Sequence, residues 1–328
     1  MTRAVAKAHA NLALVKYWGK RNESLILPMN GSISMTLQEL SVVTRVEFHP
    51  TLTEDQLVIN GTRAKMPDII RMTDFLDIVR LMGGINWRAQ VVSNGNVPLA
   101  SGLSSSSSAY AALALASTQA LGLYLSGREL SLLARRGSGS ATRSIYGGLV
   151  EWMKGEREDG KDSYALPLSS AKSWDLAMVV AIAGNSPKRV SSREGMKRAV
   201  MTSVFYRSWL DTVTSDLNAA RKAIFRRDFT TLGCITEASS YKMHGTTMGS
   251  HPAFTYWQAP TVEVIHQVES LRDKGIECYA SIDAGAHVGV LCQSGDANEI
   301  YHALSGVGGI TQVLIAHPGP GTELVDSL

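Results

Sequence analysis

One uncharged run of this chain combines glycine, serine and alanine in a pattern suited to binding phosphate. Residues 97–115 read VPLASGLSSSSSAYAALAL, so a Gly/Ser turn leads directly into a segment with strong helix propensity. Backbone N–H groups at such a helix start favour an anion, and serine hydroxyls can bind phosphate oxygens or Mg²⁺. On this run alone, a phosphate site and a plain N-capped core helix are equally good interpretations. A flexible linker is a weaker one, because the run continues as a helix.

Asp283 is the second candidate for chemistry. It lies in an Asp-Ala-Gly segment between two apolar stretches at 277–282 and 287–293. A positioned carboxylate can accept a proton from an alcohol or orient it. Asp-Ala-Gly is also ordinary turn chemistry at a corner between strands, and the local sequence favours that interpretation.

Basic side chains gather at Lys188, Arg189 and Arg193. Such a cluster is usually a solvated surface, but a substrate with several negative charges would give it a function. Several motifs are absent from the sequence: a standard P-loop, Gly-x-Gly-x-x-Gly, Cys-x-x-Cys, a histidine pair at i, i+4, and a Gly-x-Ser-x-Gly elbow. We therefore predict no protein metal site.

Length, charge and cysteine content limit the classes of protein to which this chain can belong. A chain of 328 residues favours two domains, and a net charge of +3 without long Lys/Arg blocks does not indicate a nucleic-acid partner. Three cysteines without metal or redox spacing suggest a reducing compartment. No apolar run approaches the length of a membrane span. We expect a cytoplasmic protein with no membrane partner.

Apolar periodicity predicts a mixture of helices and strands. A capping box at Ser126–Glu129 marks one helix start. The domain boundary is expected between residues 165 and 190, and we place it at 180, giving an N-terminal domain (1–180) and a C-terminal domain (181–328). Strands are expected at 3–20, 36–48, 56–59, 87–93, 145–153, 176–183, 277–282, 287–293 and 311–316, and helices at 67–82, 109–123, 126–136, 198–226, 228–242, 260–274 and 296–304.

Eight segments together resemble the mevalonate diphosphate decarboxylase family, in order and through nearly the whole chain. KYWGK and GSGSAxRS are highly specific, whereas the serine run alone identifies only the wider superfamily of galactokinase, homoserine, mevalonate and phosphomevalonate kinases. The segments are AHANLALVKYWGK (8–20), LPMNGSISMTL (27–37), GLSSSSSAYA (102–111), RRGSGSATRSIYGG (135–148), KRVSSR (188–193), MH (243–244), FTY (254–256) and IDAG (282–285).

The resemblance implies an α+β fold of the small-molecule-kinase superfamily. The resemblance makes the N-terminal domain (1–180) a ribosomal-protein-S5-like, ATP-binding domain and the C-terminal domain (181–328) a ferredoxin-like α/β sandwich, with the active site in the cleft between them. It also implies the reaction: ATP phosphorylates the tertiary 3-hydroxyl of mevalonate 5-diphosphate, and loss of that phosphate and of CO₂ gives isopentenyl diphosphate. ATP, Mg²⁺ bridging its phosphates, and a homodimer follow from the family.

The resemblance assigns roles to matched positions. Asp283 matches the catalytic aspartate. Lys16 matches the lysine that steadies this aspartate, the substrate carboxylate and developing negative charge. Arg143 matches the arginine that grips the substrate, with its fork suited to the carboxylate. Contacts to the diphosphate chain are implied for Tyr17, Lys20, Ser138, Gly139, Ser140, Ser192 and Arg193, and contacts to the nucleotide for Ser93, Asn94, Gly102, Ser104, Ser105, Ser106 and Ser108.

The chain departs from the family at Ala286-His287, where Pro-Asn is usual. His287 either titrates near neutral pH beside the catalytic position or simply replaces a turn residue. Alternative activities are a phosphomevalonate decarboxylase or a mevalonate 3-kinase of the same superfamily. A catalytically silent ATP-binding regulator would be a different class of function.

Overall fold

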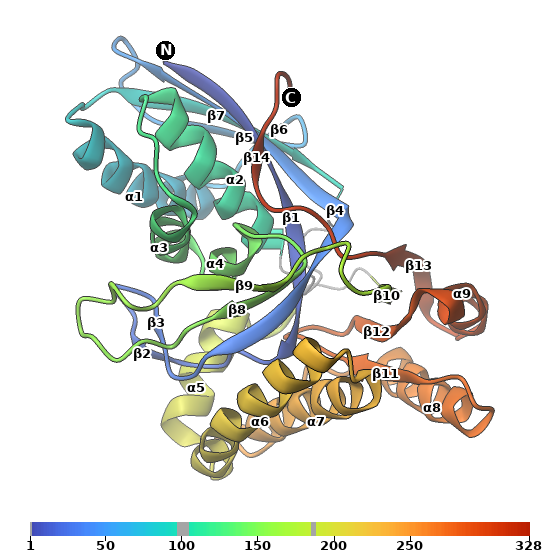
Figure 1. Cartoon of the computed structure of the whole chain (residues 1–328). Helices are drawn as coiled ribbons and strands as arrows, with labels where there is room; N and C mark the ends of the chain where they lie inside the picture. The colour runs from blue at the N-terminus through green and yellow to red at the C-terminus, as the bar shows by residue number, and fades with distance from the viewer. Residues whose placement is uncertain (1, 97–104, 185–187) are drawn as a thin grey trace.

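Two β-sheets organise the chain, each in its own α+β unit (Figure 1). The computed structural model describes residues 2–96, 105–184 and 188–328. The first sheet has the strand order β14-β1-β4-β7-β5-β6, and β8 and β9 extend it from β4. Its strands are β1 (Arg3–Val15), β4 (Ser32–His49), β5 (Gln56–Ile59), β6 (Thr62–Arg63), β7 (Arg88–Gly95), β8 (Leu149–Trp152), β9 (Ala165–Ser169) and β14 (Glu323–Leu324), beside a separate hairpin of β2 (Lys20–Asn22) and β3 (Leu27–Pro28).

Helices cover one face of the first sheet. The Ala-rich helix α2 packs directly on β1 and β4, and its small side chains bring the helix close to the strands. The expected capping box is confirmed, because Ser126 and Glu129 exchange side-chain and backbone hydrogen bonds. The helices of this unit are α1 (Met66–Gly83), α2 (Ser105–Ala120), α3 (Gly127–Gly137) and α4 (Ala141–Ser144).

The second sheet has the order β11-β12-β10-β13 and is covered on both faces. Its central strand β10 is buried along its whole length. Met178 and Val180 point into the core shared with α6, α7 and β1, whereas Ala177 and Val179 point toward α8 and α9. The elements are β10 (Leu176–Ala183), α5 (Ser192–Thr202), α6 (Tyr206–Arg226), α7 (Phe229–Met248), α8 (Ala259–Asp273), β11 (Cys278–Ser281), β12 (Val288–Gln293), the 3₁₀ turn η1 (Ser294–Asp296), α9 (Ala297–Ser305) and β13 (Ile310–Ala316).

The chain crosses between the two units twice. It leaves the first unit after β9 and enters β10, and it returns after β13 to pair β14 with β1. The returning segment is fixed by backbone hydrogen bonds, among them Gly319 N–H to Thr36 O at 2.8 Å and Val325 N–H to Val5 O at 3.0 Å. Residues of both crossings, including Trp174 and Pro318, line one cavity of about 500 Å³. The two ends of the chain lie at the same end of the molecule (Figure 1).

Most expected elements are confirmed, and two differ for physical reasons. The single helix expected at 198–226 is two helices, since Ser203 is extended and its hydroxyl accepts the Phe205 N–H at 3.3 Å instead of continuing the helix. The first strand ends at Val15 rather than at residue 20, because Lys16 turns toward the second unit.

The division at residue 180 stays a prediction. It falls within β10, and all of that strand belongs to the second sheet. Among the helices that the structure describes, none is both long and apolar enough to span a membrane.

Candidate active site

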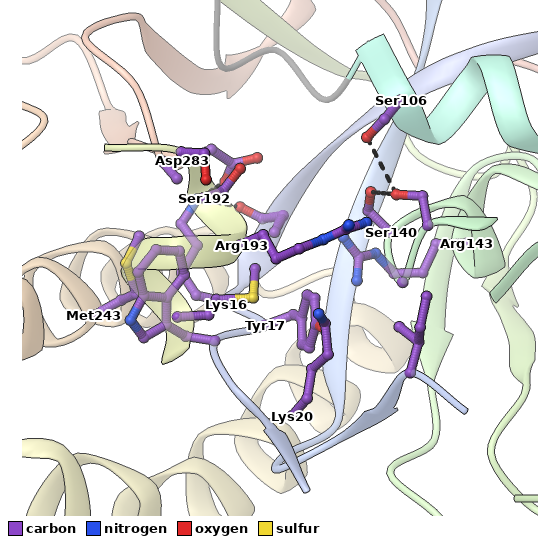
Figure 2. A pocket seen from close by; sticks show the side chains of 18 of the residues that line it. Lys16, Tyr17, Lys20, Ser106, Ser140, Arg143, Ser192, Arg193, Met243 and Asp283 are labelled. Carbon is purple, nitrogen blue, oxygen red and sulfur yellow. Dashed lines mark hydrogen bonds and ion pairs between the residues drawn. The ribbon is translucent and has the colours of Figure 1, made fainter. Parts of the chain in front are cut away.

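A cavity of about 420 Å³ lies where the end of β1 meets the turn after β11 and the start of α5. Figure 2 shows Asp283 and Met243 on one side of it and Ser106, Ser140 and Arg143 on the other, with Arg193 between them. Eleven of the residues predicted from sequence line this cavity: Lys16, Tyr17, Lys20, Ser106, Ser138, Gly139, Ser140, Arg143, Ser192, Arg193 and Asp283.

Lys16 and Asp283 form an ion pair across the two units. The Lys16 Nζ lies 2.7 Å from Asp283 Oδ1, and it also donates to Ser281 Oγ at 2.8 Å and to Ala13 O at 2.7 Å. The backbone N–H of Lys16 donates to Ser239 Oγ at 3.0 Å. All three ammonium protons therefore have acceptors, and the aspartate is held with a fixed orientation.

Burial sets the electrostatics of this pair. Lys16 is 2% exposed, and the loss of hydration lowers its pKa. The negative charge of Asp283 opposes this effect, but the pKa remains lowered. The nearby Arg143 guanidinium lowers the lysine pKa further. The cavity thus holds two buried cations and one partly exposed carboxylate.

Arg143 is buried without a carboxylate partner among the described residues. Its nitrogens donate to three neutral oxygens: Ser34 Oγ at 2.8 Å, Ser32 Oγ at 2.6 Å and Asn11 Oδ1 at 3.0 Å. Burial lowers its pKa to about 10, which leaves it charged at neutral pH. A buried, oriented cation with only neutral partners is a strong site for a ligand anion.

Gly139 allows the rings of Tyr17 and Trp152 to pack closely against the backbone beside the cavity. A Cβ at this position would lie 2.9 Å from the Trp152 ring and 3.1 Å from the Tyr17 ring and hydroxyl, so a side chain would displace these rings. The Tyr17 hydroxyl is buried without a hydrogen-bond partner in the described part of the chain, and burial raises its pKa. Such a hydroxyl is available to a ligand oxygen.

The serine hydroxyls of the two glycine- and serine-rich segments meet at the cavity. Ser106, in the first turn of α2, lies 3.1 Å from Ser138 Oγ, which is 3.4 Å from Ser140 Oγ. The segment after α3 is therefore in hydrogen-bonding contact with the start of α2. Local sequence alone does not predict this contact.

Four further cations line the cavity. Ser192 and Arg193 form the first turn of α5, whose N-cap Ser191 accepts the Glu194 N–H at 3.2 Å. Lys20 is paired with Glu23 at 2.5 Å. Burial lowers the pKa of Lys188, and Asp283 acts to raise it. Arg71, on α1, completes the set and also lines the adjoining cavity that contains Arg136.

Some predicted nucleotide residues are not brought to this cavity. Ser93 lies in β7 and its hydroxyl is 2.9 Å from Thr44 Oγ1, while Asn94 follows it along the strand. Ser108 is fully buried within α2. Gly102 and Ser104 lie outside the described residues, as does the side chain of Ser105, the first residue of α2. The nucleotide role of these residues stays a prediction.

His287 does not titrate near neutral pH. It is 6% exposed, and burial together with Lys188 lowers its pKa to about 4. Its Nδ1 accepts the backbone N–H of Ala183 at 3.0 Å, so the neutral ring carries its proton on Nε2. Two interpretations were given for His287 in place of the usual family residue. The interpretation in which this histidine titrates near neutral pH is therefore wrong.

Sequence reasoning missed two parts of the site. Arg71 was not singled out, because its place on the helix at 66–83 resembles an ordinary exposed position. The partners of Arg143 were also missed: Asn11 carried a signal as a polar residue within an expected strand, whereas Ser32 and Ser34 precede the strand expected at 36–48 and lie in β4, which begins at Ser32. Buried polar side chains require partners, and here the partner is the guanidinium.

Protein groups alone make no metal site in residues 2–96, 105–184 and 188–328, where no group of three or more His, Cys, Asp or Glu is placed to hold an ion. The donors facing the cavity are serine hydroxyls and one carboxylate. These oxygens suit Mg²⁺, which binds through few protein ligands when phosphates supply the rest.

Fold and cavity together define an α+β protein of two units with a strongly basic cavity between them. Residues 8–165 match the family model of the diphosphomevalonate decarboxylase-like N-terminal domain, and residues 178–315 match that of the mevalonate 5-diphosphate decarboxylase C-terminal domain. The chain belongs to the diphosphomevalonate decarboxylase family.

Individual relatives agree. The chain is 33% identical to diphosphomevalonate decarboxylase ERG19 of Gibberella zeae over 94% of this chain and 87% of the relative. It is 42% identical to mevalonate diphosphate decarboxylase from Staphylococcus aureus, with a TM-score of 0.94 over 99% of this chain and 98% of the other. It is 44% identical to MDDEF, solved in complex with MVAPP, AMPPCP and magnesium, with a TM-score of 0.93 over 99% of both chains. The expected family, fold class and enzyme activity are confirmed.

Proposed function

We propose that this cleft carries out the ATP-dependent decarboxylation of mevalonate 5-diphosphate to isopentenyl diphosphate, with release of ADP, phosphate and CO₂. The observation that carries the residue assignment is that Arg143, a buried cation whose hydrogen-bond partners among the described residues are all neutral, lines the same cavity as the Lys16–Asp283 pair. The similarity to MDDEF, which was solved with MVAPP, AMPPCP and magnesium, supports the same set of ligands here.

In the first step, Asp283 orients the tertiary 3-hydroxyl and accepts its proton as the oxygen takes the γ-phosphoryl group of ATP. A tertiary alcohol is far too weak an acid to ionise alone at neutral pH, so a positioned carboxylate is needed. Lys16 holds Asp283 in one orientation through the 2.7 Å contact. ADP leaves with the electrons of the broken P–O bond.

In the second step, the 3-phosphate leaves, positive charge develops at C3, and the C–C bond to the carboxylate breaks. The electrons of that bond form the new double bond, and CO₂ is released. Arg143 grips the substrate carboxylate through its planar fork, and Lys16 steadies the negative charge that develops. The diphosphate chain is held by Tyr17, Lys20, Ser138, Gly139, Ser140, Ser192 and Arg193, which share the cavity.

ATP lies over the start of α2, with Ser106 facing its phosphates. Arg71 and Lys188 add positive charge to the lining of the same cavity. Ser106 and Asp283 are the protein oxygens that would hold Mg²⁺ together with the ATP phosphates, and the ion would supply positive charge to the transferring phosphoryl group.

The protein is further proposed to be a cytoplasmic homodimer divided at about residue 180. Free, buried Cys278 and Cys292, whose pKa values burial raises to about 12, fit a reducing compartment. Light scattering on the purified chain tests the dimer.

The activity is tested by measuring ADP and CO₂ release with Mg-ATP and, in turn, mevalonate, its 5-phosphate and its 5-diphosphate. Equal amounts of ADP and CO₂ from the diphosphate alone are expected. ADP without CO₂, or turnover of the other two compounds in preference, would move the activity to a kinase or a monophosphate decarboxylase. No ADP with any of the three would leave a silent nucleotide-binding protein.

A further inference from the structure

One turn of α7 binds both backbone polar groups of the residue that precedes Asp283. Ile282 lies one position beyond the end of β11 and outside the β11–β12 ladder. Its N–H donates to Ser240 Oγ at 3.1 Å, and its carbonyl oxygen lies 3.3 Å from His244 Nε2. Ser240 and His244 are four positions apart in α7, so they project from the same face of the helix. Side chains of α7 therefore take the place of a neighbouring strand as hydrogen-bond partners directly before Asp283.

The contact to Ile282 fixes the tautomer of the His244 ring. A carbonyl oxygen can only accept, so Nε2 carries the proton and donates it, while Nδ1 has no partner among the described residues. Burial lowers the pKa of His244 to about 3, so the ring is neutral at neutral pH. The ring is fully buried and packs against the rings of Tyr256 and Trp257, with centroid distances of 6.2 and 5.2 Å. The donor is therefore held in place by packing.

The same turn of α7 also binds the backbone at Lys16. Ser239, next to Ser240, accepts the Lys16 N–H at 3.0 Å. Both serines are buried, and α7 packs against β1 and β11, the strands that lead to Lys16 and Asp283. One helix thus contacts the backbone beside each member of the ion pair, although the two members come from different units.

We infer that Ser240 and His244 are positioning residues, which set the direction of the Asp283 carboxylate toward Lys16 by holding the backbone of Ile282. The inference rests on the proposed function, since Asp283 and Lys16 face the substrates only if the cleft is the active site. Neither Ser240 nor His244 lines the cavity, so both act through Ile282 rather than by touching substrate.

Other contacts of this loop hold its ends rather than its middle. The β11–β12 ladder fixes the chain as far as Ser281. On the far side of Asp283, Thr261 Oγ1 donates to Ala286 O at 2.6 Å. The backbone torsions of Ile282 lie between the ladder and Asp283, and its N–H and carbonyl belong to the two peptide planes that these torsions rotate. Loss of either contact would therefore leave the ends of the loop in place and change the direction of the aspartate.

Two variants of His244 that differ in one donor test the inference. His244→Phe keeps a ring and removes the N–H, so kcat should fall on the order of tenfold, because small misplacements of catalytic groups are costly. His244→Gln keeps an N–H donor at the same number of bonds from Cγ as His Nε2, and should retain kcat within about threefold of the parent chain. The KM for each substrate should change less than kcat in His244→Phe, since the residue does not line the cavity. Steady-state CO₂ release from mevalonate 5-diphosphate is the measurement.

Ser240→Ala removes the other contact to Ile282, and Ser117→Ala is its matched control. Ser117 is a fully buried serine of α2 that donates to Leu113 O of its own helix at 2.6 Å. Ser240 makes the same kind of bond, to Thr236 O at 3.1 Å, so the two variants differ in the contact to Ile282. Ser240→Ala should lower kcat about threefold or more, whereas Ser117→Ala should lower the melting temperature and leave kcat near that of the parent chain.

Amide hydrogen exchange without substrates gives a readout besides activity. The peptide that covers residues 280–286 should exchange faster in Ser240→Ala and His244→Phe than in His244→Gln or the parent chain. Peptides from β10 and α2 should exchange as in the parent chain. This comparison separates release of the Asp283 loop from a general loss of stability.

The outcomes separate the inference from the proposed function. A parent chain that releases no CO₂ from the diphosphate defeats the proposed function and the inference with it. An active parent chain with equal kcat for His244→Phe and His244→Gln overturns only the inference. Faster exchange at 280–286 with unchanged kcat also overturns it, since α7 would then order the loop without any effect on the reaction. So does a loss of kcat in Ser117→Ala as large as that in Ser240→Ala, because general destabilisation would explain both.

Discussion

Lys16 Nζ and Asp283 Oδ1 lie 2.7 Å apart although 267 residues separate them in sequence. The lysine follows β1 of the first sheet and the aspartate follows β11 of the second sheet, so their contact joins the two units within the cavity. The lysine is 2% exposed, and a buried ion pair contributes little net stability because both groups lose hydration. The pair is better explained by the reaction than by the fold.

Replacement of the aspartate tests this explanation. Asp283→Asn keeps the shape of the side chain and removes the proton acceptor, so ADP and CO₂ release should both fall, on the order of a thousandfold. Binding of mevalonate 5-diphosphate, measured by calorimetry, should persist. Turnover near the parent rate would remove Asp283 from the base role.

Arg143 should matter more for ligand binding than for stability. Arg143→Met removes a buried charge whose partners are two hydroxyls, which can reorient, and the Asn11 amide, which Ser140 O and Ser144 Oγ hold in place, so the melting temperature should change little. The rise in melting temperature caused by mevalonate 5-diphosphate should be largely lost, and Arg143→Lys should restore it only in part, because a lysine lacks the planar fork.

Arg135→Met is the matched control for Arg143. This arginine is also buried, but it donates to the backbone carbonyls of Leu25, Gly160 and Ser163, which cannot rotate away. The control should lower the melting temperature and leave the ligand-induced rise largely intact. The opposite pattern in the two variants would contradict the assignment of Arg143.

The Ser106 hydroxyl should contribute to nucleotide binding. Ser106→Ala should raise the KM for ATP about three- to tenfold, as expected for one lost hydrogen bond to a charged group, with a smaller effect on the KM for mevalonate 5-diphosphate. Ser215→Ala, on the exposed face of α6, is the control. An unchanged KM for ATP in Ser106→Ala would place the phosphates elsewhere.

Acid should destabilise the fold through buried neutral histidines. Burial lowers the pKa of His244 to about 3 and that of His287 to about 4, from an ordinary value of 6.5. The unfolded chain therefore takes up protons that the folded chain does not, so stability is full above pH 6.5 and falls as the pH decreases toward these values. At pH 5 the loss should be on the order of 2 kcal/mol for His244.

The measurement is the melting temperature between pH 7.5 and 4.5. His244→Phe should give a shallower decrease, whereas His266→Gln, an exposed histidine on α8, should follow the parent curve. A melting temperature independent of pH across this range would mean that these histidines titrate alike in the folded and unfolded chain.

Local sequence predicts the elements well where one pattern dominates. The apolar run of β10 and the capping box of α3 required no tertiary information. The break between α5 and α6 was missed because it depends on the Ser203 hydroxyl competing with the helix for a backbone N–H. The strand β14 was missed because two residues carry no periodicity, and it exists only by pairing with β1.

The site was predicted through family motifs rather than through residue chemistry. Local sequence favoured an ordinary turn at Asp283, and nothing local connects this residue to Lys16. The cation Arg71 reaches the cavity only because α1 lies beside α2 and α3, which a pattern within one helix cannot show. Contacts between residues far apart in sequence could therefore be predicted only where the family resemblance implied them.

The two crossings of the chain at one corner restrict how the units can move. Because Trp174 and Pro318 line the same cavity, both covalent links lie close together, far along β1 from Lys16. A rigid rotation of one unit must have its axis near that corner, and displacements grow with distance from it. Lys16 and Asp283 lie far from that corner, so a small rotation of one unit would change the distance between them more than distances near the corner. Closure of the two units would therefore be seen first in the geometry of the reacting groups.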